Sequence, residues 1–102
     1  MNFELEIIWS ARAKITYFNV LDYLNKNWTR KELVQFSQRT QVTINAIRKN
    51  PGIFPISSKN KEIRRALVDM NNLFFYKVDI SNKRLYLLTF FDCRQDQKTL
   101  LF

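Results

Sequence analysis

The segment Asn50-Pro51-Gly52-Ile53-Phe54-Pro55 decides the fold, because the hydrophobic periodicity of the chain changes on either side of it. It contains the single glycine and both prolines of the sequence. Proline cannot continue a helix, and the residue before a proline is biased toward extended backbone. A helix that reaches Asn50 therefore ends there, and we expect helices before this segment and extended structure after it.

Two helices are predicted before Pro51. Apolar residues recur every three or four positions over about 11–27, which is the spacing of one helix face, and Ser10 is placed to cap the first turn. Thr29 and Glu32 have the spacing of a capping box, so a second helix is expected from there to Asn50. Because the turn between the helices is so short, they should form an antiparallel hairpin.

Four strands are predicted around this hairpin. Apolar side chains alternate with Glu4 and Glu6 over residues 3–9, the two-residue period of a strand with one buried face. After Pro55, three segments are rich in β-branched and aromatic residues and are separated by short polar turns: 63–68, 73–80 and 85–91. The final residues, 96–102, fit a short helix, a tail or an edge strand.

The predicted order is β-α-α-β-β-β, an α+β fold in a single domain over residues 1–102. We expect an antiparallel sheet, made of the C-terminal meander plus the N-terminal strand, packed on the α-helical hairpin. The expected core residues lie on the helix stripes and strand patterns: Trp9, Ile15, Phe18, Leu21, Leu33, Phe36, Ile44, Ile47, Leu67 and Leu87.

Composition narrows the chemistry that the chain can perform. The 102 residues carry 17 Lys plus Arg against 9 Asp plus Glu, a formal charge of +8, and 46% are hydrophobic, enough to fill a core. There is no histidine, which excludes Ser-His-Asp triads and zinc-protease motifs, and the single Cys93 excludes a disulfide framework. We expect no metal and no cofactor, so any catalysis would fall to Arg, Lys, Tyr and carboxylates.

Neither a membrane span nor a signal peptide is predicted. No apolar run approaches the roughly 20 residues that cross a bilayer, and Glu4 and Glu6 stand where a signal peptide would be basic and then apolar. We therefore expect a cytoplasmic protein, and an unpaired thiol agrees with a reducing compartment.

The stretch from Arg48 to Arg65 is strongly basic, with six cations against the single carboxylate of Glu62, a local charge of +5. One interpretation is a solvated loop leading into a strand. The other is a binding surface for single-stranded RNA or for an acidic protein, since Arg64 and Arg65 are neighbours on a strand and must point to opposite faces. The candidate binding residues are Arg48, Lys49, Lys59, Lys61, Arg65 and Lys77.

Aromatic residues cluster late in the chain, in 74–76 and 90–91, and adjacent rings on a strand divide between its two faces. One set should be core, including Tyr76. The other set would be exposed unless another segment covers it, and exposed aromatic surface marks a partner site. Cys93 has no histidine to activate it, which favours a structural thiol over a nucleophile.

Several segments resemble the RelE/ParE superfamily of type II toxin–antitoxin toxins. They are residues 64–68 (RRALV), 73–79 (LFFYKVD) and 87–96 (LLTFFDCRQD), and the opening from Ile8-Trp9-Ser10 is also similar. The likeness covers nearly the whole chain and lies in the order, spacing and length of the segments. The Asp-x-Arg-Gln-Asp ending is similar to a subgroup known as plasmid stabilisation proteins.

The resemblance implies a toxin that a cognate antitoxin neutralises, in a toxin–antitoxin hetero-oligomer. RelE-like members cut messenger RNA in the ribosomal A site without metal, and ParE-like members poison DNA gyrase. Carried over by position, two family cations fall on Arg64 and Arg94, which are the candidate catalytic residues. The remaining family positions fall on Ala66, Leu73 and Leu100, which supply no cation and no phenol.

Without these family side chains, the remaining arginines can stabilise negative charge, but no residue is an obvious proton carrier. Arginine has too high a pKa to act easily as a base. The first hypothesis is therefore a growth-inhibiting toxin that binds a macromolecular target, with gyrase as the family precedent. The alternatives are a ribosome-dependent mRNA endoribonuclease and a non-toxic binding module. Whether the chain is an enzyme stays open, and the endoribonuclease gains if Lys61, Lys77 or Asp92 reaches the site.

Overall fold

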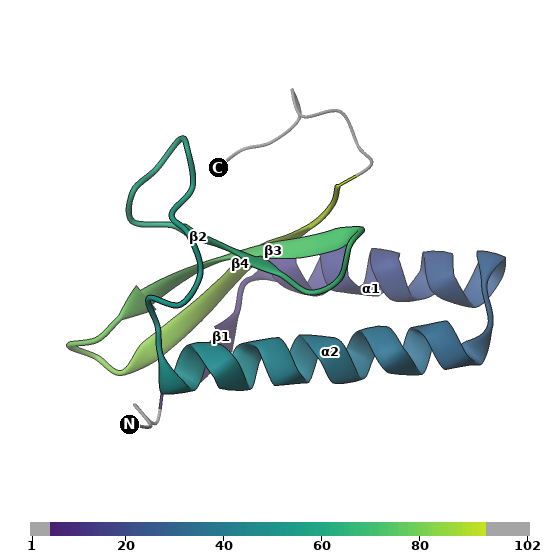
Figure 1. Ribbon diagram of the computed structural model, residues 1–102, viewed down its shortest axis with the longest axis horizontal. Helices are drawn as coiled ribbons and strands as arrows, with labels where there is room; N and C mark the ends of the chain where they lie inside the picture. The colour runs from purple at the N-terminus through teal and green to yellow at the C-terminus, as the bar shows by residue number, and fades with distance from the viewer. Residues whose placement is uncertain (1–4, 94–102) are drawn as a thin grey trace.

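The computed structural model describes residues 5–93 and has the predicted order of elements (Figure 1). The two helices lie side by side on one side of the sheet, and their far ends extend beyond it. The elements are β1 (Glu6–Trp9), α1 (Ala11–Asn27), α2 (Arg30–Lys49), β2 (Arg64–Leu67), β3 (Asn72–Asp79) and β4 (Arg84–Asp92). The expectations for residues 3–4 and 96–102 lie outside the described residues.

Both helices begin and end where the sequence predicts. The Ser10 hydroxyl accepts a hydrogen bond from the Ala13 N–H at 2.9 Å and donates one to the Leu88 carbonyl at 2.8 Å, so the cap of α1 is also tied to β4. Thr29 and Glu32 form the capping box of α2. At the other end of α2, the Asn50 N–H donates to the Ala46 carbonyl at 3.0 Å, directly before Pro51.

The sheet has the strand order β1-β4-β3-β2 and is mixed. β3 is antiparallel to β2 and to β4, which confirms the predicted meander. β1, however, runs parallel to β4, so the prediction of an entirely antiparallel sheet is wrong. The physical reason is that no tight turn joins these two strands: the chain passes through the helical hairpin and two further strands between them, and such a long crossover permits parallel pairing.

A β-bulge in β4 divides its side chains between the two faces of the sheet. Phe75 pairs with Thr89, but the next residue, Tyr76, pairs with Leu87, so Leu88 is the extra residue. As a result Leu85, Leu87 and Phe90 all face the helices, whereas Leu88 and Phe91 pack in a second cluster on the opposite face.

The core predictions are confirmed in part. Phe36, Ile44, Ile47 and Leu87 are buried, while Trp9 and Leu21 are half-buried against that core and Leu33 is half-buried. Ile15, Phe18 and Leu67 are exposed, with 61%, 64% and 55% of their surface open, so these three predictions are wrong.

The error at Ile15 and Phe18 has a geometric cause. α1 carries a second apolar stripe, and that stripe, made of Ala13, Tyr17, Val20, Leu21 and Leu24, packs on the sheet. Leu67 fails for a different reason, because it lies on the edge strand and on the face of the sheet turned away from the helices.

Aromatic side chains fill both faces of the sheet. Phe74, Tyr76 and Phe90 belong to the core beneath the helices, as expected for Tyr76. Phe75 and Phe91 belong to the second cluster, together with Ile63 from the segment before β2. The second aromatic set is therefore covered, with Phe75 only 1% exposed, and it does not form an exposed aromatic patch.

None of the helices within residues 5–93 combines the length and the apolar character needed to span a membrane.

Candidate functional site

Arg64 and Arg65 point to opposite faces of β2, as predicted. Arg64 is in register with Tyr76, whose side chain lies in the core beneath the helices, and Arg65 is in register with Phe75 of the second cluster. Arg64 is half-buried and Arg65 is exposed. The two neighbouring cations therefore have different surroundings, and each must be given its own role.

Arg64 holds the segment that separates α2 from β2. Its Nη1 donates a hydrogen bond to the Phe54 carbonyl at 2.7 Å, and the Tyr76 hydroxyl donates one to the Pro51 carbonyl at 2.9 Å. Burial raises the pKa of Tyr76 to about 12, although the nearby Arg64 charge opposes the rise. Tyr76 is therefore a neutral hydrogen-bond donor at physiological pH, and these two side chains fasten residues 51–55 to the sheet.

Arg65 lies on what we call the open face, the surface of the sheet turned away from the helices. Its backbone N–H donates to the Pro55 carbonyl at 2.9 Å, while its guanidinium is on the exposed side. Lys77 lies two residues beyond Phe75, the partner of Arg65, and hence on the same face. Diagonal neighbours in an antiparallel pair have Cα atoms about 7–8 Å apart, so both cations can reach one phosphate.

The loop over residues 56–63 brings further charges to the open face. Backbone hydrogen bonds from Ser57 to the Ile63 carbonyl (2.6 Å) and from Ile63 to the Asn60 carbonyl (3.1 Å) fix its shape. At its end, Glu62 Oε2 lies 3.5 Å from Lys77 Nζ, and Ile63 packs in the second cluster. The ion pair is exposed on both sides and so contributes little stability, but it shows that the loop reaches Lys77.

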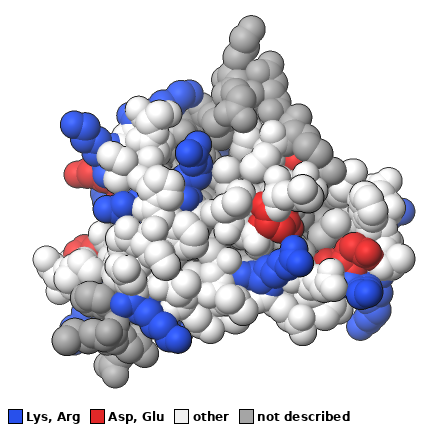
Figure 2. Space-filling view, in the orientation of Figure 1, with Lys and Arg blue, Asp and Glu red and all other residues white. Residues whose placement is uncertain are grey.

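Lys59 and Lys61 belong to the same loop, and both are exposed. Figure 2 shows Lys and Arg side chains gathered over this loop at the upper left, with one acidic side chain among them. We define the basic site as Glu62, Arg65 and Lys77, flanked by Lys59 and Lys61. It joins one carboxylate to cations from a loop and two strands.

The other predicted site residues that the structure describes do not lie on the open face. Arg48 and Lys49 end α2, in the helix layer, where their charges suit the negative end of the helix dipole. Arg48 is half-buried, and its Nε has no hydrogen-bond partner among the described residues. Arg94 lies outside the described residues, so its expected approach to Arg64 stays a prediction.

Sequence reasoning treated Glu62 only as a counter-charge and missed its pairing with Lys77. No spacing rule signals such a contact, because it depends on how the loop before β2 folds back. Lys77, by contrast, could be placed beside Arg65 from strand alternation alone.

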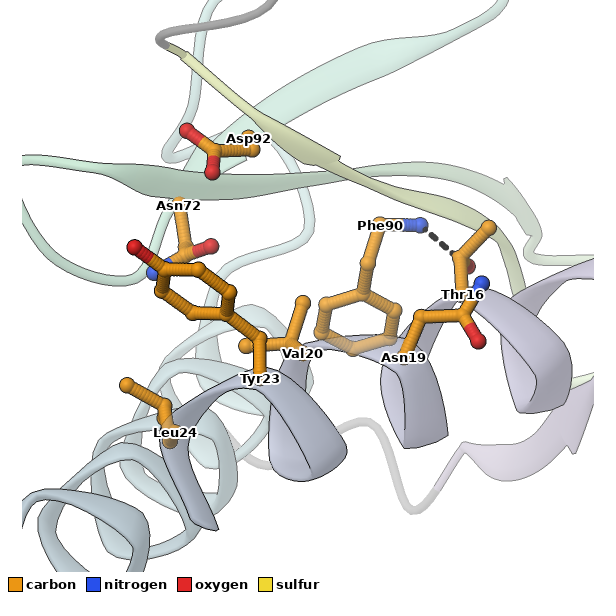
Figure 3. Close-up of a pocket in the computed structure, with 8 residues that line it drawn as sticks. All are labelled: Thr16, Asn19, Val20, Tyr23, Leu24, Asn72, Phe90 and Asp92. Carbon is orange, nitrogen blue, oxygen red and sulfur yellow. Dashed lines mark hydrogen bonds between the residues drawn. The ribbon is translucent and has the colours of Figure 1, made fainter. Parts of the chain in front are cut away.

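A separate cavity of about 230 Å³ lies between α1 and the sheet (Figure 3). Its lining residues are Thr16, Asn19, Val20, Tyr23, Leu24, Asn72, Phe90 and Asp92. The Phe90 N–H donates to Thr16 Oγ1 at 2.9 Å across its floor, and the Tyr23 hydroxyl points toward Asn72. The lining includes a carboxylate and no Lys or Arg, so this cavity does not suit a phosphate. Asp92 therefore belongs to the helix side of the sheet.

Cys93 follows β4 and is half-buried in the second cluster. Burial raises the pKa of its thiol, and the carboxylates of Asp92 and Asp69 raise it further. The thiol is therefore held protonated at neutral pH, which agrees with the structural role predicted for it. Among residues 5–93, no cluster of three or more His, Cys, Asp or Glu side chains is arranged to bind a metal ion.

In sequence, the chain matches no family model and no curated protein. Solved structures do match it. The YoeB dimer from Staphylococcus aureus aligns with a TM-score of 0.58 and 16% identity, over 84% of this chain and 93% of that one. The Escherichia coli DinJ–YafQ toxin–antitoxin complex aligns with a TM-score of 0.58 and 14% identity, over 87% and 92%.

The two alignments cover most of this chain and nearly all of each matched chain. At such low sequence identities they establish a shared fold and nothing more. The chain therefore shares its architecture with these two solved structures. More specifically, the chain has the RelE/ParE fold, which confirms the resemblance noted in the sequence. The plasmid-stabilisation subgroup stays a prediction.

Proposed function

We propose that the protein is the toxin of a type II toxin–antitoxin pair and acts as a RelE-like, ribosome-dependent endoribonuclease on messenger RNA. The observation that carries the proposal is the Glu62–Lys77 pair at 3.5 Å on the same face as Arg65. This arrangement supplies the proton carrier that the family positions alone lack. It favours the RNA hypothesis over gyrase poisoning, which needs no acid–base pair.

The chemistry assigned to the site is attack of an RNA 2′-hydroxyl on the adjacent phosphate. Glu62 accepts the proton of the 2′-hydroxyl as the O2′–P bond forms. Lys77 donates a proton to the 5′-oxygen as the P–O5′ bond breaks, and the products are a 2′,3′-cyclic phosphate and a 5′-hydroxyl. Arg65 stabilises the charge that develops on the phosphate oxygens with its planar pair of donors.

The cations of the basic site also explain how RNA would be held. One face of the sheet and the loop beside it carry four cations: Lys59, Lys61, Arg65 and Lys77. Each phosphate of a single strand that a cation neutralises contributes about −0.7 to the slope of log affinity against log salt. Four contacts predict a slope of about −2.8. A flat salt response would contradict phosphate binding at this face.

A cognate antitoxin is the proposed partner in the cytoplasm, where the ribosome is. The DinJ–YafQ structure is a toxin–antitoxin complex, and it is similar in fold. A chain of charge +8 with its cations gathered around a sheet edge suits an acidic, partly disordered peptide that pairs as a helix or strand. An adjacent gene for a small acidic protein would support this partner.

The test is induced expression in a bacterial host, with and without the adjacent gene, read as growth arrest and as messenger cleavage against DNA damage. We expect arrest with messenger cleavage and cyclic-phosphate ends. Glu62→Gln and Lys77→Met should abolish cleavage while the melting temperature stays unchanged. Lys31→Met, at an exposed position of α2, is the charge-matched control. DNA damage without messenger cleavage would favour the gyrase hypothesis and overturn this one.

A further inference from the structure

Tyr86 occupies a place on the open face that the proposed chemistry does not use. In the sheet it stands between Ile8 of β1 and Lys77 of β3, in register with both. It is half-buried, and its hydroxyl lies 3.5 Å from Arg84 Nη1. An aromatic ring is therefore held in the middle of the sheet, with one side open to solvent and a cation of the basic site directly beside it.

The surface next to Tyr86 is hollowed. An open depression is lined by Lys77, Val78, Asp79, Ile80 and Tyr86. Ile80 is 52% exposed, so the depression has an apolar wall as well as an aromatic one. A flat, largely apolar group carrying polar edges would cover both walls.

We propose that this depression holds a nucleobase of single-stranded RNA, with the Tyr86 ring as its stacking platform. The inference rests on the proposed function, and it adds the residue that binds the base to those that bind the phosphate. Directly opposed residues in a sheet have Cβ atoms about 4.5–5.5 Å apart. A phosphate at Lys77 thus places the base of the same or the next nucleotide within reach of Tyr86.

The charges around the depression separate the base from the phosphate. Asp79 accepts hydrogen bonds from the Asn82 N–H (3.2 Å) and from Asn82 Nδ2 (2.7 Å), which close the turn between β3 and β4. Its carboxylate stands in register with Arg84, whose positive charge balances it, so this end of the depression exerts little net force on a phosphate. The cations of the basic site therefore draw backbone phosphates to the Arg65 side of Lys77, and the depression is left for the uncharged base.

The platform can be tested by measuring the binding of a fluorescently labelled oligoadenylate at several salt concentrations. We expect Tyr86→Leu to weaken binding about 5- to 100-fold at every salt concentration, because stacking on an aromatic ring is lost. The slope against log salt should not change, since no ion contact is removed. Tyr86→Phe keeps the ring and should bind like the parent. Lys77→Met should instead reduce the magnitude of the slope by about 0.7.

Tyr23→Leu, on the helix side of the molecule, is the matched control and should bind like the parent. Thermal melts of each variant check that the fold is retained. Parental affinity for Tyr86→Leu, with a reduced slope for Lys77→Met, would overturn the stacking platform and leave the proposed function standing. If the parent protein binds no oligoadenylate at any salt concentration, the platform and the RNA hypothesis fall together.

Discussion

Replacing Arg64 and Arg65 one at a time separates the anchor of the fold from the proposed binding site, because the two side chains lie on opposite faces of β2. The Arg64 guanidinium makes a 2.7 Å hydrogen bond to the Phe54 carbonyl. Hydrogen bonds to charged groups contribute about 1.5–3 kcal/mol, so Arg64→Ala should lower the free energy of unfolding by about 2 kcal/mol. For a domain of about 100 residues this corresponds to a fall in Tm of roughly 10 °C.

Arg65→Ala should behave in the opposite way. The backbone N–H of Arg65 makes the hydrogen bond to Pro55, and alanine retains it. The exposed side chain contributes within about 0.5 kcal/mol, so the melting temperature should stay near that of the parent. Growth arrest and RNA affinity should nevertheless fall, since the guanidinium that is proposed to contact phosphate is lost.

The assay is a thermal melt by circular dichroism for each variant, paired with growth arrest and oligonucleotide binding. The reasoning is refuted if Arg64→Ala melts with the parent and yet loses toxicity. That result would make Arg64 the phosphate-binding residue, as the family resemblance implies, and would remove Arg65 from the site. A large loss of stability in Arg65→Ala would instead contradict the assignment of the faces.

Three further predictions concern the core, the anchor and the end of the chain. Phe36 is 2% exposed, so Phe36→Ala should lower the free energy of unfolding, measured by urea titration, by about 3–5 kcal/mol. Phe18 is 64% exposed, so Phe18→Ala should change it by less than about 0.5 kcal/mol. Equal effects of the two substitutions would contradict the packing of α1. Between pH 10 and 12 the tyrosine of the unfolded chain ionises, while Tyr76 in the fold stays protonated because its pKa is raised to about 12, so the free energy of unfolding should fall by about 2–3 kcal/mol across that window. Urea titrations at stepped pH measure this fall, and Tyr76→Phe should remove the part due to Tyr76. If the pH dependence of the unfolding free energy is the same in Tyr76→Phe as in the parent, Tyr76 is not buried as described. Arg94→Lys should weaken growth arrest with an unchanged melting temperature, and Arg94→Ala should abolish it; toxicity retained in both would exclude Arg94 from the site.

The sequence predicts the secondary structure well, because its signals are local. Ser10, the capping box at Thr29 and the break at Pro51 each act within a few residues, and all three mark real helix ends. The direction of β1 could not be predicted in the same way. Its neighbour β4 is more than seventy residues away in the chain, and alternation in residues 3–9 carries no information about the direction of a distant partner.

The choice of helix face shows a second limit. α1 has two apolar stripes, and periodicity alone cannot decide which one meets the sheet. The stripe with Tyr17 packs because its ring meets Trp9, Phe36 and Phe90 at centroid distances of 5.1–5.7 Å. Phe18, one position later, points outward. The decision depends on shapes contributed by three other elements, which no single window of sequence contains.

The strand residues of the candidate site can be predicted from the sequence, but its loop residue cannot, because the position of the loop depends on distant parts of the chain. Alternation along β2 and β3 places Arg65 and Lys77 on one face and Arg64 and Tyr76 on the other. One face of these strands therefore holds the fold, and the opposite face is the one proposed to bind. Glu62 joins the site only through the loop that folds back over Phe75. That loop has its far end fastened by Arg64 and Tyr76 through Phe54 and Pro51. The residues on the helix side thus position the carboxylate on the open side. Damage to the anchor should therefore impair the proposed chemistry indirectly, through the position of Glu62, even though no anchoring side chain lies on the face proposed to bind RNA.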